Sequence, residues 1–383
     1  MTVRLVELFA GIGAQRRALD LVGEREGIDV ETVAISEIDH YALKSYKAIF
    51  GDCPNLGDIR YIESLPECDI LTYSFPCQSL SKTGRREGMT KGSETESSLL
   101  WEVERLLSAS DHLPEWLVME NVPDVINDIN MADFREWVKV LSSHGYSSKW
   151  GILNSLQFGI PQNRRRCFMI SHLNGPAPDL PKGHPLTKCL RDVMETDVPE
   201  KYYLSKSRLA GVLASSEQEK VRGNGFSFEL CDERGVSHTI STKEGSRKTS
   251  TFIEVKDGDG FVKAYDGDGY NLSFVGRGGR SRVQRQRSPT LQSSTVMVGC
   301  IDRSRIRKLT PRECWRLMGR TDEEYDRASA VVSDSQLYKQ AGNSIVVPVL
   351  DAIFTTMLTS TGGQTTLSMF EKEGLEIKNG GIA

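Results

Sequence analysis

The sequence predicts an α/β protein with a doubly wound, mostly parallel sheet and a second, smaller part made of loops and short strands. Two observations predict this fold class. Across residues 1–180, short apolar runs alternate with helix-like segments, which is the rhythm of βαβ units. After a Pro- and Gly-rich stretch at 174–185, residues 186–305 are rich in Gly, Ser, Thr and Arg and carry only short strand-like pieces.

The regular elements follow one another in a simple order. Strands are expected over residues 3–9, 30–35, 70–73, 116–120 and 167–171, and helices over 14–22, 41–50, 99–108 and 133–143. Helical patterning returns over 310–318, and the apolar residues 346–357 are expected to pack on the first domain. We therefore predict one domain from residues 1–185 and 306–358, a second from 186–305, and a flexible tail over 359–383.

The composition is that of an ordinary globular protein, with 38% hydrophobic and 26% charged residues in a chain of 383. No stretch approaches the roughly 18 continuous apolar residues that a membrane span needs, and the first residues are typical of a strand, not of a signal peptide. The eight cysteines include no pair at CxxC spacing, which argues against a zinc site or a disulfide framework. We expect a cytoplasmic protein with reduced thiols, no metal and no membrane partner.

The charges are unevenly distributed. The net charge is −4, yet residues 201–310 hold 20 Lys and Arg against 12 Asp and Glu. A basic segment inserted in an acidic protein indicates a polyanionic partner. The alternative is a solvated, flexible loop.

A glycine-rich turn follows the first expected strand. It consists of Phe9, Ala10, Gly11, Ile12 and Gly13. Glycines between a strand and a helix let the backbone approach a ligand closely, although a tight turn alone also favours them. The third glycine of a phosphate-binding turn is absent, because position 16 is Arg16. A cofactor without pyrophosphate, such as S-adenosylmethionine, therefore fits better than NAD.

Other segment ends supply partners for a bound adenosine. Glu37 follows the second strand, where a carboxylate can bind ribose hydroxyls. Ile38 can pack on the adenine ring, and Asp58 can accept a hydrogen bond from the adenine amino group. Asn343 and Ser344 precede an apolar helix and either close the cofactor pocket or simply cap that helix.

Cys77 lies in the sequence Ser-Phe-Pro-Cys-Gln directly after the apolar strand 70–73. Ligands bind at the carboxyl ends of parallel strands, so this thiol is expected to face a ligand. Pro76 fixes its own backbone φ and so narrows the position of the thiol. A structural cysteine after a turn is the alternative. The polar segment 79–98 that follows is longer than typical connections, which suggests a lid or binding loop.

Charged side chains are expected at the same edge of the sheet. Glu120 ends the strand 116–120, where a partly buried carboxyl would be protonated and donate to a ring nitrogen; an acid near a helix N-terminus is the alternative. Alternation places Arg164 and Arg166 on one face before the strand 167–171. Two converging arginines can hold a base carbonyl and a phosphate, and otherwise they are surface charges.

The order and spacing of these motifs resemble the DNA cytosine-C5 methyltransferase family. The resemblance covers about residues 3–172 and 303–358 and runs through motifs at 9–13, 74–78, 120–122, 162–166, 309–313 and 342–344. The stretches 9–16 and 72–78 look especially like the spiroplasma-type CpG methyltransferases. The resemblance implies a Rossmann-like, S-adenosylmethionine-dependent methyltransferase fold in which residues 186–305 form the target-recognition domain.

The resemblance also implies a covalent mechanism. The thiolate of Cys77 attacks carbon 6 of a cytosine, and carbon 5 then takes the methyl group of S-adenosyl-L-methionine. Loss of the carbon-5 proton and of the cysteine leaves 5-methylcytosine and S-adenosyl-L-homocysteine. Glu120 contacts the ring N3 and amino group, Arg164 holds the carbonyl O2, and Arg166 lies close by. The base must be flipped out of the duplex, because its target atom is inaccessible in the stack.

Further contacts are implied in the same way. The cofactor site also takes in Ile59, Pro76 and Leu99. The expected DNA contacts are Gln78, Ser81, Thr83, Arg85, Gln162, Arg277, Arg280, Arg282, Arg285, Arg287, Thr290 and Leu291. Thr290 and Leu291 resemble the family's Thr-Leu pair near the flipped base, and residues 288–293 are themselves similar to 237–242. Many relatives carry Arg in the segment before the Leu-Leu-Trp-Glu stretch, whereas this chain has Thr95-Glu96-Ser97-Ser98 there, and the charge of Glu96 would repel a nearby phosphate.

The implied partner is double-stranded DNA, and the protein is expected to act as a monomer. Its setting is open between a restriction–modification system, whose endonuclease acts separately, and an orphan or phage-type methylase. CpG is suggested as the target only by the resemblance of the catalytic half, whereas specificity is expected to reside in residues 186–305, which give no indication of the target sequence. One alternative is an enzyme that methylates tRNA, against which the large inserted basic domain argues. The other is a catalytically silent DNA-binding protein, against which the intact Cys77, Glu120 and arginine pair argue.

Overall fold

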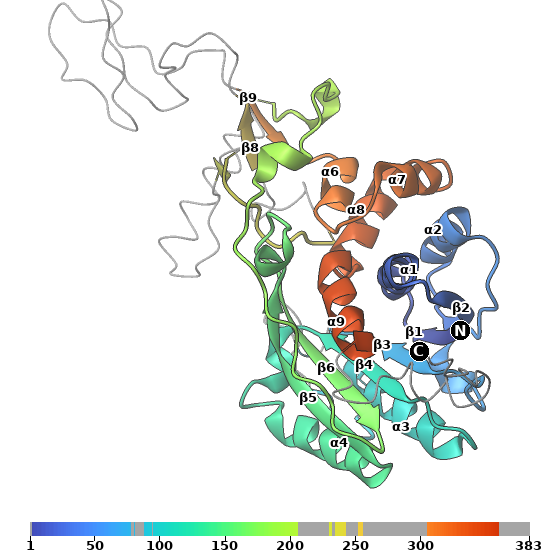
Figure 1. Cartoon of the computed structure of the whole chain (residues 1–383). Helices are drawn as coiled ribbons and strands as arrows, with labels where there is room; N and C mark the ends of the chain where they lie inside the picture. Colours follow the sequence, from blue (N-terminus) through green and yellow to red (C-terminus); the bar gives the residue numbers. More distant parts are fainter. Residues whose placement is uncertain are drawn as a thin grey trace, which may run out of the picture. The chain divides into compact units, whose positions relative to one another are not determined.

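The computed structural model of the chain describes residues 2–77, 80, 88–93, 95–205, 230–231, 234–242, 252–255 and 305–359. The chain divides into two compact units (Figure 1). The first contains residues 1–188, 239–242 and 314–383, and the second contains 189–238 and 243–313. The assignment of residues 186–305 as a recognition domain stays a prediction.

The first unit is built on a six-stranded sheet in the order β2-β1-β3-β4-β6-β5. The strands are β1 Thr2–Leu8, β2 Asp29–Ser36, β3 Ile70–Tyr73, β4 Trp116–Asn121, β5 Tyr146–Asn154 and β6 Arg165–Leu173. The pairs β1–β2, β1–β3 and β3–β4 are parallel, whereas β6 runs antiparallel to both β4 and β5. This confirms the predicted α/β fold with a mostly parallel sheet.

Helices cover both faces of this sheet. The helices of this unit are α1 Ala14–Glu26, α2 His40–Phe50, α3 Leu100–Ala109, α4 Met131–Ser143, α7 Asp322–Ser329, α8 Asp334–Asn343 and α9 Val347–Thr359, of which α7 packs against α2 and α8. Every residue of β3 and β4 is buried, as expected for central strands of a sheet with two covered faces. On one face, side chains of β3 and β4 form a core with α3 and α4, while α9 packs beside α1 (Figure 1).

Two further features concern the helices. Asp39 caps α2, because its carboxylate accepts from the backbone N–H groups of Tyr41 and Ala42.

The stretch Asp334–Thr359 is long and apolar enough, by length and composition, to cross a membrane. However, 61% of its most apolar window is buried inside the protein, as in the core helix of a soluble domain.

The second unit contains three described strands in the order β7-β8-β9: Leu230–Cys231, Phe252–Val255 and Arg305–Lys308. Arg307 and Glu313 form an almost fully buried ion pair, with 2.7 Å between Nη2 and Oε1. The Glu313 carboxylate also accepts from the backbone N–H groups of Thr310 and Glu195. These bonds attach the start of helix α6, Pro311–Arg316, to Arg307 and Glu195.

Candidate active site

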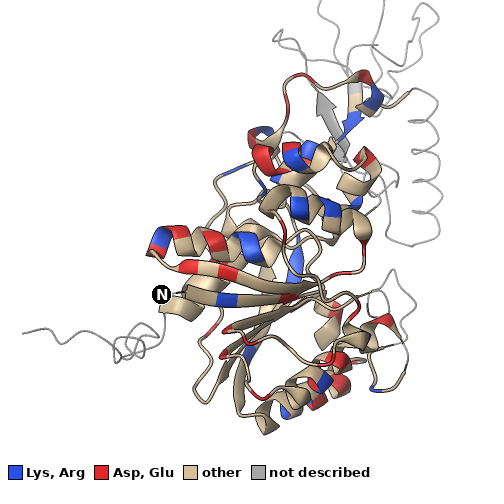
Figure 2. Cartoon of the chain, turned by 90° about the vertical axis from the view of Figure 1, so that its right-hand side faces the viewer, with Lys and Arg blue, Asp and Glu red and all other residues tan. Residues whose placement is uncertain are grey.

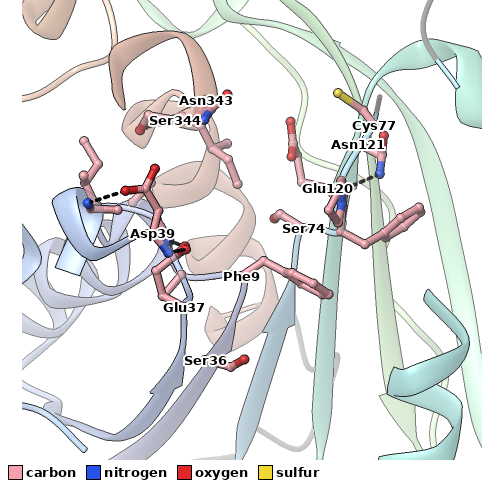
Figure 3. A pocket seen from close by; sticks show the side chains of 18 of the residues that line it. Phe9, Ser36, Glu37, Asp39, Ser74, Cys77, Glu120, Asn121, Asn343 and Ser344 are labelled. Carbon is pink, nitrogen blue, oxygen red and sulfur yellow. Dashed lines mark hydrogen bonds between the residues drawn. The ribbon is translucent and has the colours of Figure 1, made fainter. Parts of the chain in front are cut away.

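A cavity of about 370 Å³ opens at the carboxyl edge of the parallel strands (Figure 3). Its walls bring together segments that are far apart in the sequence. They are residues 9–12, 36–39, 58–60, 74–77, 120–122 and 342–345, with Glu96, Leu99, Arg164 and Arg166. Figure 3 shows Cys77 and Glu120 on one side of the pocket, Glu37 and Asp39 on the other, and Asn343 and Ser344 between them. The cavity thus contains nearly all the residues predicted for the cofactor and for catalysis.

The glycine turn after β1 has an unusual backbone that explains its sequence. Phe9, Gly11 and Gly13 all adopt positive φ angles, of 59°, 57° and 68°. A Cβ on Gly13 would lie 2.7 Å from ring carbons of both Phe50 and Tyr46, so no larger side chain fits there. Gly13 therefore lets the turn pack against Phe50 and Tyr46, while residues 9–12 line the cavity.

Glu37 holds this turn in place. Its carboxylate accepts from the backbone N–H of Gly11 at 2.8 Å, and from those of Ile38 and Asp39 at 2.8 and 2.7 Å. The side chain that the sequence assigns to a ribose thus also ties β2 to the glycine turn. The neighbouring Ile38 is 71% exposed on the cavity wall, which is unusual for a large apolar side chain.

Asp58 lines the cavity and is paired with Arg60, a residue that sequence analysis did not single out. Arg60 donates from its backbone N–H and its Nε at 3.0 Å, and from Nη2 at 2.5 Å. The side-chain hydrogen bond from Arg60 holds the pKa of Asp58 below its usual value, so this carboxylate stays charged.

Two hydrogen bonds hold the loop that carries Cys77. Asn121, at the end of β4, donates its side-chain N–H to the carbonyl of Phe75 at 2.9 Å. The fully buried Ser97 donates its hydroxyl to the carbonyl of Pro76 at 2.8 Å. Sequence analysis missed Ser97, because a bond across 21 residues leaves no local pattern. Both bonds restrict the backbone immediately before the thiol.

The reversed direction of β6 explains how the arginines reach this edge. Because β6 is antiparallel to β4, its first residues lie beside the last residues of β4, with Cys167 opposite Asn121. Arg166 Nε therefore lies 3.2 Å from Glu120 Oε1, and both side chains are mostly buried, at 17% and 12% exposed.

The electrostatics of the three groups are linked. Burial raises the pKa of the Glu120 carboxyl, and the positive charges of Arg166 and Arg164 counteract this. Burial also raises the pKa of the Cys77 thiol, and the nearby Glu120 raises it further, while Arg166 and Arg164 lower it. In this state the site favours a protonated thiol beside a carboxyl that binds a proton more readily than usual.

Arg164 is placed differently from its neighbour. It is only 3% exposed, and its Nη atoms donate to the backbone carbonyls of Ile240 at 3.0 Å and of Gly342 and Ser344 at 2.8 Å. Its Nε is buried and has no hydrogen-bond partner among the described residues. The sequence-based role of holding a base carbonyl thus fits Arg166, beside Glu120, better than Arg164.

Residues 239–242, which we call the strap, also belong to this side of the first unit. Gln162 accepts from the backbone N–H of Ile240 at 3.0 Å and donates to the carbonyl of Leu317 at 2.8 Å. Thr239 donates its hydroxyl to the carbonyl of Asn163 at 2.6 Å. The side chain of Gln162 is fully buried and bonded at both ends, and the DNA contact expected of it stays a prediction.

The remaining predicted DNA contacts are not part of what the structure describes. Outside the described residues lie Gln78, Ser81, Thr83, Arg85, Arg277, Arg280, Arg282, Arg285, Arg287, Thr290 and Leu291.

The described part of the first unit carries charges of both signs. Figure 2 shows Lys and Arg interspersed with Asp and Glu along its helices. Within the described ranges, no group of three or more His, Cys, Asp and Glu side chains is placed to hold a metal ion.

Comparison with known proteins gives consistent matches along the chain. The type II methyltransferase M2.ScrFI of Lactococcus lactis subsp. cremoris is 31% identical, over 94% of this chain and 99% of its own. The orphan methyltransferase M.SssI of Spiroplasma monobiae is 29% identical, over 92% of this chain and 96% of its own. The fold is similar to that of the Dnmt2 methyltransferase of S. pombe, with a TM-score of 0.65 at 20% identity over 94% of this chain and 99% of that one. The model of the family described as C-5 cytosine-specific DNA methylase matches residues 3–359, and this chain belongs to that family.

Proposed function

We propose that the chain transfers the methyl group of S-adenosyl-L-methionine to carbon 5 of a flipped cytosine in duplex DNA, through a covalent bond between Cys77 and carbon 6. The observation that supports this most directly is the shared cavity. It brings the Cys77 thiol, the Glu120 carboxyl and the Arg166 guanidinium to the same edge of the sheet as the glycine turn.

The residues of the cavity fit the cofactor that the family implies. Ile38 and Ile59 offer apolar surface for an adenine, and Asp58 keeps a charged carboxylate in the cavity for its amino group. The Glu37 carboxylate, Asn343 and Ser344 are polar groups on the wall. When bound, the cofactor supplies an electrophilic methyl group on a sulfonium.

The protein's own groups then move electrons and protons on the base. The Cys77 thiol loses its proton to solvent as its sulfur bonds to carbon 6, and Glu120, which burial biases toward its protonated form, donates a proton to ring N3. Carbon 5 gains the electron pair and takes the methyl group. A water molecule takes up the carbon-5 proton, Cys77 leaves as a thiolate, and ring N3 returns its proton to Glu120, which restores the aromatic ring.

The two arginines have separate roles in this proposal. Arg166 lies beside Glu120, where it holds the carbonyl O2 of the base and offsets negative charge near the thiol. The Nη atoms of Arg164 donate to three backbone carbonyls, so this residue positions the walls of the site. Ile240, which is bonded to Arg164, and Thr239, which is bonded to Asn163, are candidates for the pair beside the flipped base that the sequence assigned to Thr290 and Leu291.

The wider setting follows from the same proposal. The relatives named above include a type II enzyme and an orphan enzyme, so the chain is either the modification half of a restriction system or a solitary methylase. We propose that it acts as a monomer on cytoplasmic DNA. The basic segment within 186–305 then supplies DNA contacts that position the target cytosine.

Bisulfite sequencing of DNA from cells that express the protein tests this function. We expect cytosine protection at one short sequence with the wild-type chain, and none with Cys77→Ala. Methyl transfer to purified duplex DNA and to tRNA should be compared in parallel. A clear preference for tRNA, or wild-type activity of Cys77→Ala, contradicts the proposal. A duplex with 5-fluorocytosine at the target should trap a covalent complex with the wild-type chain alone, because fluorine cannot leave as the carbon-5 proton does.

A further inference from the structure

We infer that the strap, residues 239–242, couples cofactor binding to DNA binding, and that Arg164 and Gly342 are the positioning residues through which it acts. The strap is the one part of the range 189–313 that the structure groups with the first unit. The residues on either side of it, up to 238 and from 243, belong to the second unit. This inference rests on the proposed function, because it needs a DNA ligand and a nucleoside cofactor.

The first link runs from the strap to the catalytic wall of the cavity. Ile240 is fully buried, and both of its backbone polar groups are engaged. Its N–H donates to Gln162 and its carbonyl accepts from Arg164. Arg164 lines the cavity together with Cys77, and its positive charge lowers the pKa of that thiol. A displacement of the strap therefore removes a partner from a buried guanidinium at the active site, which is energetically costly.

The second link runs from the strap to the cofactor wall. Arg164 also donates to the carbonyls of Gly342 and Ser344, which line the cavity at the end of α8. The strap backbone lies directly against this turn. A Cβ on Gly342 would be 2.4 Å from the nitrogen of Thr242 and 2.5 Å from the carbonyl carbon of Ser241. The strap and the cofactor wall are therefore in contact without any intervening side chain.

These two links make the occupancy of one site depend on the other. A cofactor that orders residues 342–344 also orders Arg164 and the strap. The residues before and after the strap belong to the unit to which the proposed function assigns DNA binding, so DNA bound there restrains the strap at both ends and thereby favours cofactor binding. Such coupling is reciprocal by thermodynamic necessity and is typically about 5- to 150-fold in affinity. The conformation of the strap is thus a determinant of both affinities.

The variant Gly342→Ala tests this most sharply. Alanine favours a helix over glycine by about 1 kcal/mol, so at this helical position it should be harmless unless the strap is pressed against it. The dissociation constant of S-adenosyl-L-homocysteine is measured with and without a duplex that carries the site found by bisulfite sequencing. For the wild type we expect DNA to tighten it by at least about fivefold. For Gly342→Ala we expect this factor to fall to about one, because the added methyl group displaces the strap.

Two further variants complete the experiment. Ser335→Ala adds an alanine to an exposed position of the same helix and should keep the wild-type factor. Thr239→Val removes the hydroxyl bonded to Asn163 at almost constant volume and should lower the factor, and it decides the matter where Gly342→Ala fails to fold. If both Gly342→Ala and Thr239→Val keep the wild-type factor, the inference is overturned. Absence of methyl transfer by the wild-type chain instead overturns the proposed function, so the two failures are distinguishable.

Discussion

At the scale of single residues, Glu120 and Arg166 act on Cys77 in opposite directions. The charge of Glu120 raises the pKa of the thiol and the charge of Arg166 lowers it. We therefore expect Glu120→Gln to speed alkylation of Cys77 by iodoacetamide at pH 8, and Arg166→Gln to slow it. Both substitutions should lower methyl transfer, Glu120→Gln by about 10² or more, because a positioned proton donor is lost.

Peptide mass spectrometry after timed alkylation separates Cys77 from the other seven cysteines of the chain. Alkylation at Cys53 serves as the internal control, since neither Glu120 nor Arg166 is among the groups that influence its pKa. Equal alkylation rates of Cys77 in both variants would show that these charges do not control the thiol.

Some of these residues could be predicted from the sequence, and others could not, for a physical reason. Glu120 lies at the end of one apolar strand and Cys77 in the turn after another, so the topology of a parallel sheet alone brings them to one edge. Arg60 and Ser97 act through partners that no periodicity reveals. The role of Arg164 depends on carbonyls of residues 76 or more positions away, and that of Arg166 depends on the Glu120 carboxylate of another strand.

At the scale of elements, the short helix Glu96–Leu99 is tied to the nucleophile loop by one bond. Ser97→Ala leaves the carbonyl of Pro76 without its partner, at a cost of about 1–3 kcal/mol. If the loop relaxes in the ground state, kcat should fall about tenfold. The KM for the cofactor should stay nearly unchanged. Steady-state kinetics and the rate of 5-fluorocytosine trapping measure this.

Ser98→Ala is the matched control for that prediction. Ser98 lies on the same turn, but its hydroxyl donates to the carbonyl of Thr95 and not to the loop that carries Cys77. Its variant should keep the wild-type kcat. A parallel loss of kcat in both variants would place the effect in the stability of the turn and not in the position of the thiol.

The elements themselves were largely predictable, with one instructive exception. The strand over 70–73 and the helices over 14–22 and 41–50 have clear apolar patterns, and the structure confirms them as β3, α1 and α2. The strand β5 was missed, because most of its residues are exposed or half-buried and polar at the edge of the sheet. Without β5, the antiparallel direction of β6 has no sequence signal, although that direction delivers Arg166 to the site.

At the scale of the whole molecule, the buried Glu7 makes stability depend on pH. Burial raises the pKa of its carboxyl to about 7, although the hydroxyl of Tyr46 and the backbone N–H of Arg16 bond to it, and Arg16 and Arg320 lie near. In the unfolded chain this pKa is 4.5. Above pH 7 the folded state therefore contains an ionised buried carboxylate, which destabilises it, whereas below pH 4.5 the carboxyl is protonated in both states.

The free energy of unfolding should accordingly fall by about 3 kcal/mol from this group as the pH rises from 4.5 to 7. Glu7→Gln cannot ionise, so its stability relative to the wild type should improve as the pH rises from 5 to 8. Urea unfolding at both pH values measures the change, and any constant loss of a hydrogen bond cancels in the difference. A difference between variant and wild type that is independent of pH contradicts the assignment.

The placement of the strap could not be predicted from sequence. The similarity between 237–242 and 288–293 drew attention to both stretches, but nothing in either indicates which one contacts Gln162 and Arg164. Hydrogen bonds to backbone carbonyls place few demands on side-chain identity. Long-range contacts of this kind therefore leave almost no trace in one sequence.

The connectivity around the strap also bears on how a new target sequence is acquired. Strand β7 precedes the strap and strands β8 and β9 follow it, yet the three form one sheet. A chimera that imports only residues 243–313 from a relative would separate β7 from its pairing partner. On the proposed assignment of residues 186–305 to target recognition, transplantation of specificity must therefore move both halves together. The strap between the two halves has to keep its contacts with Gln162, Arg164 and Gly342 of the recipient. The smallest unit that can be exchanged therefore consists of residues 189–238 and 243–313 together with a strap that fits the recipient.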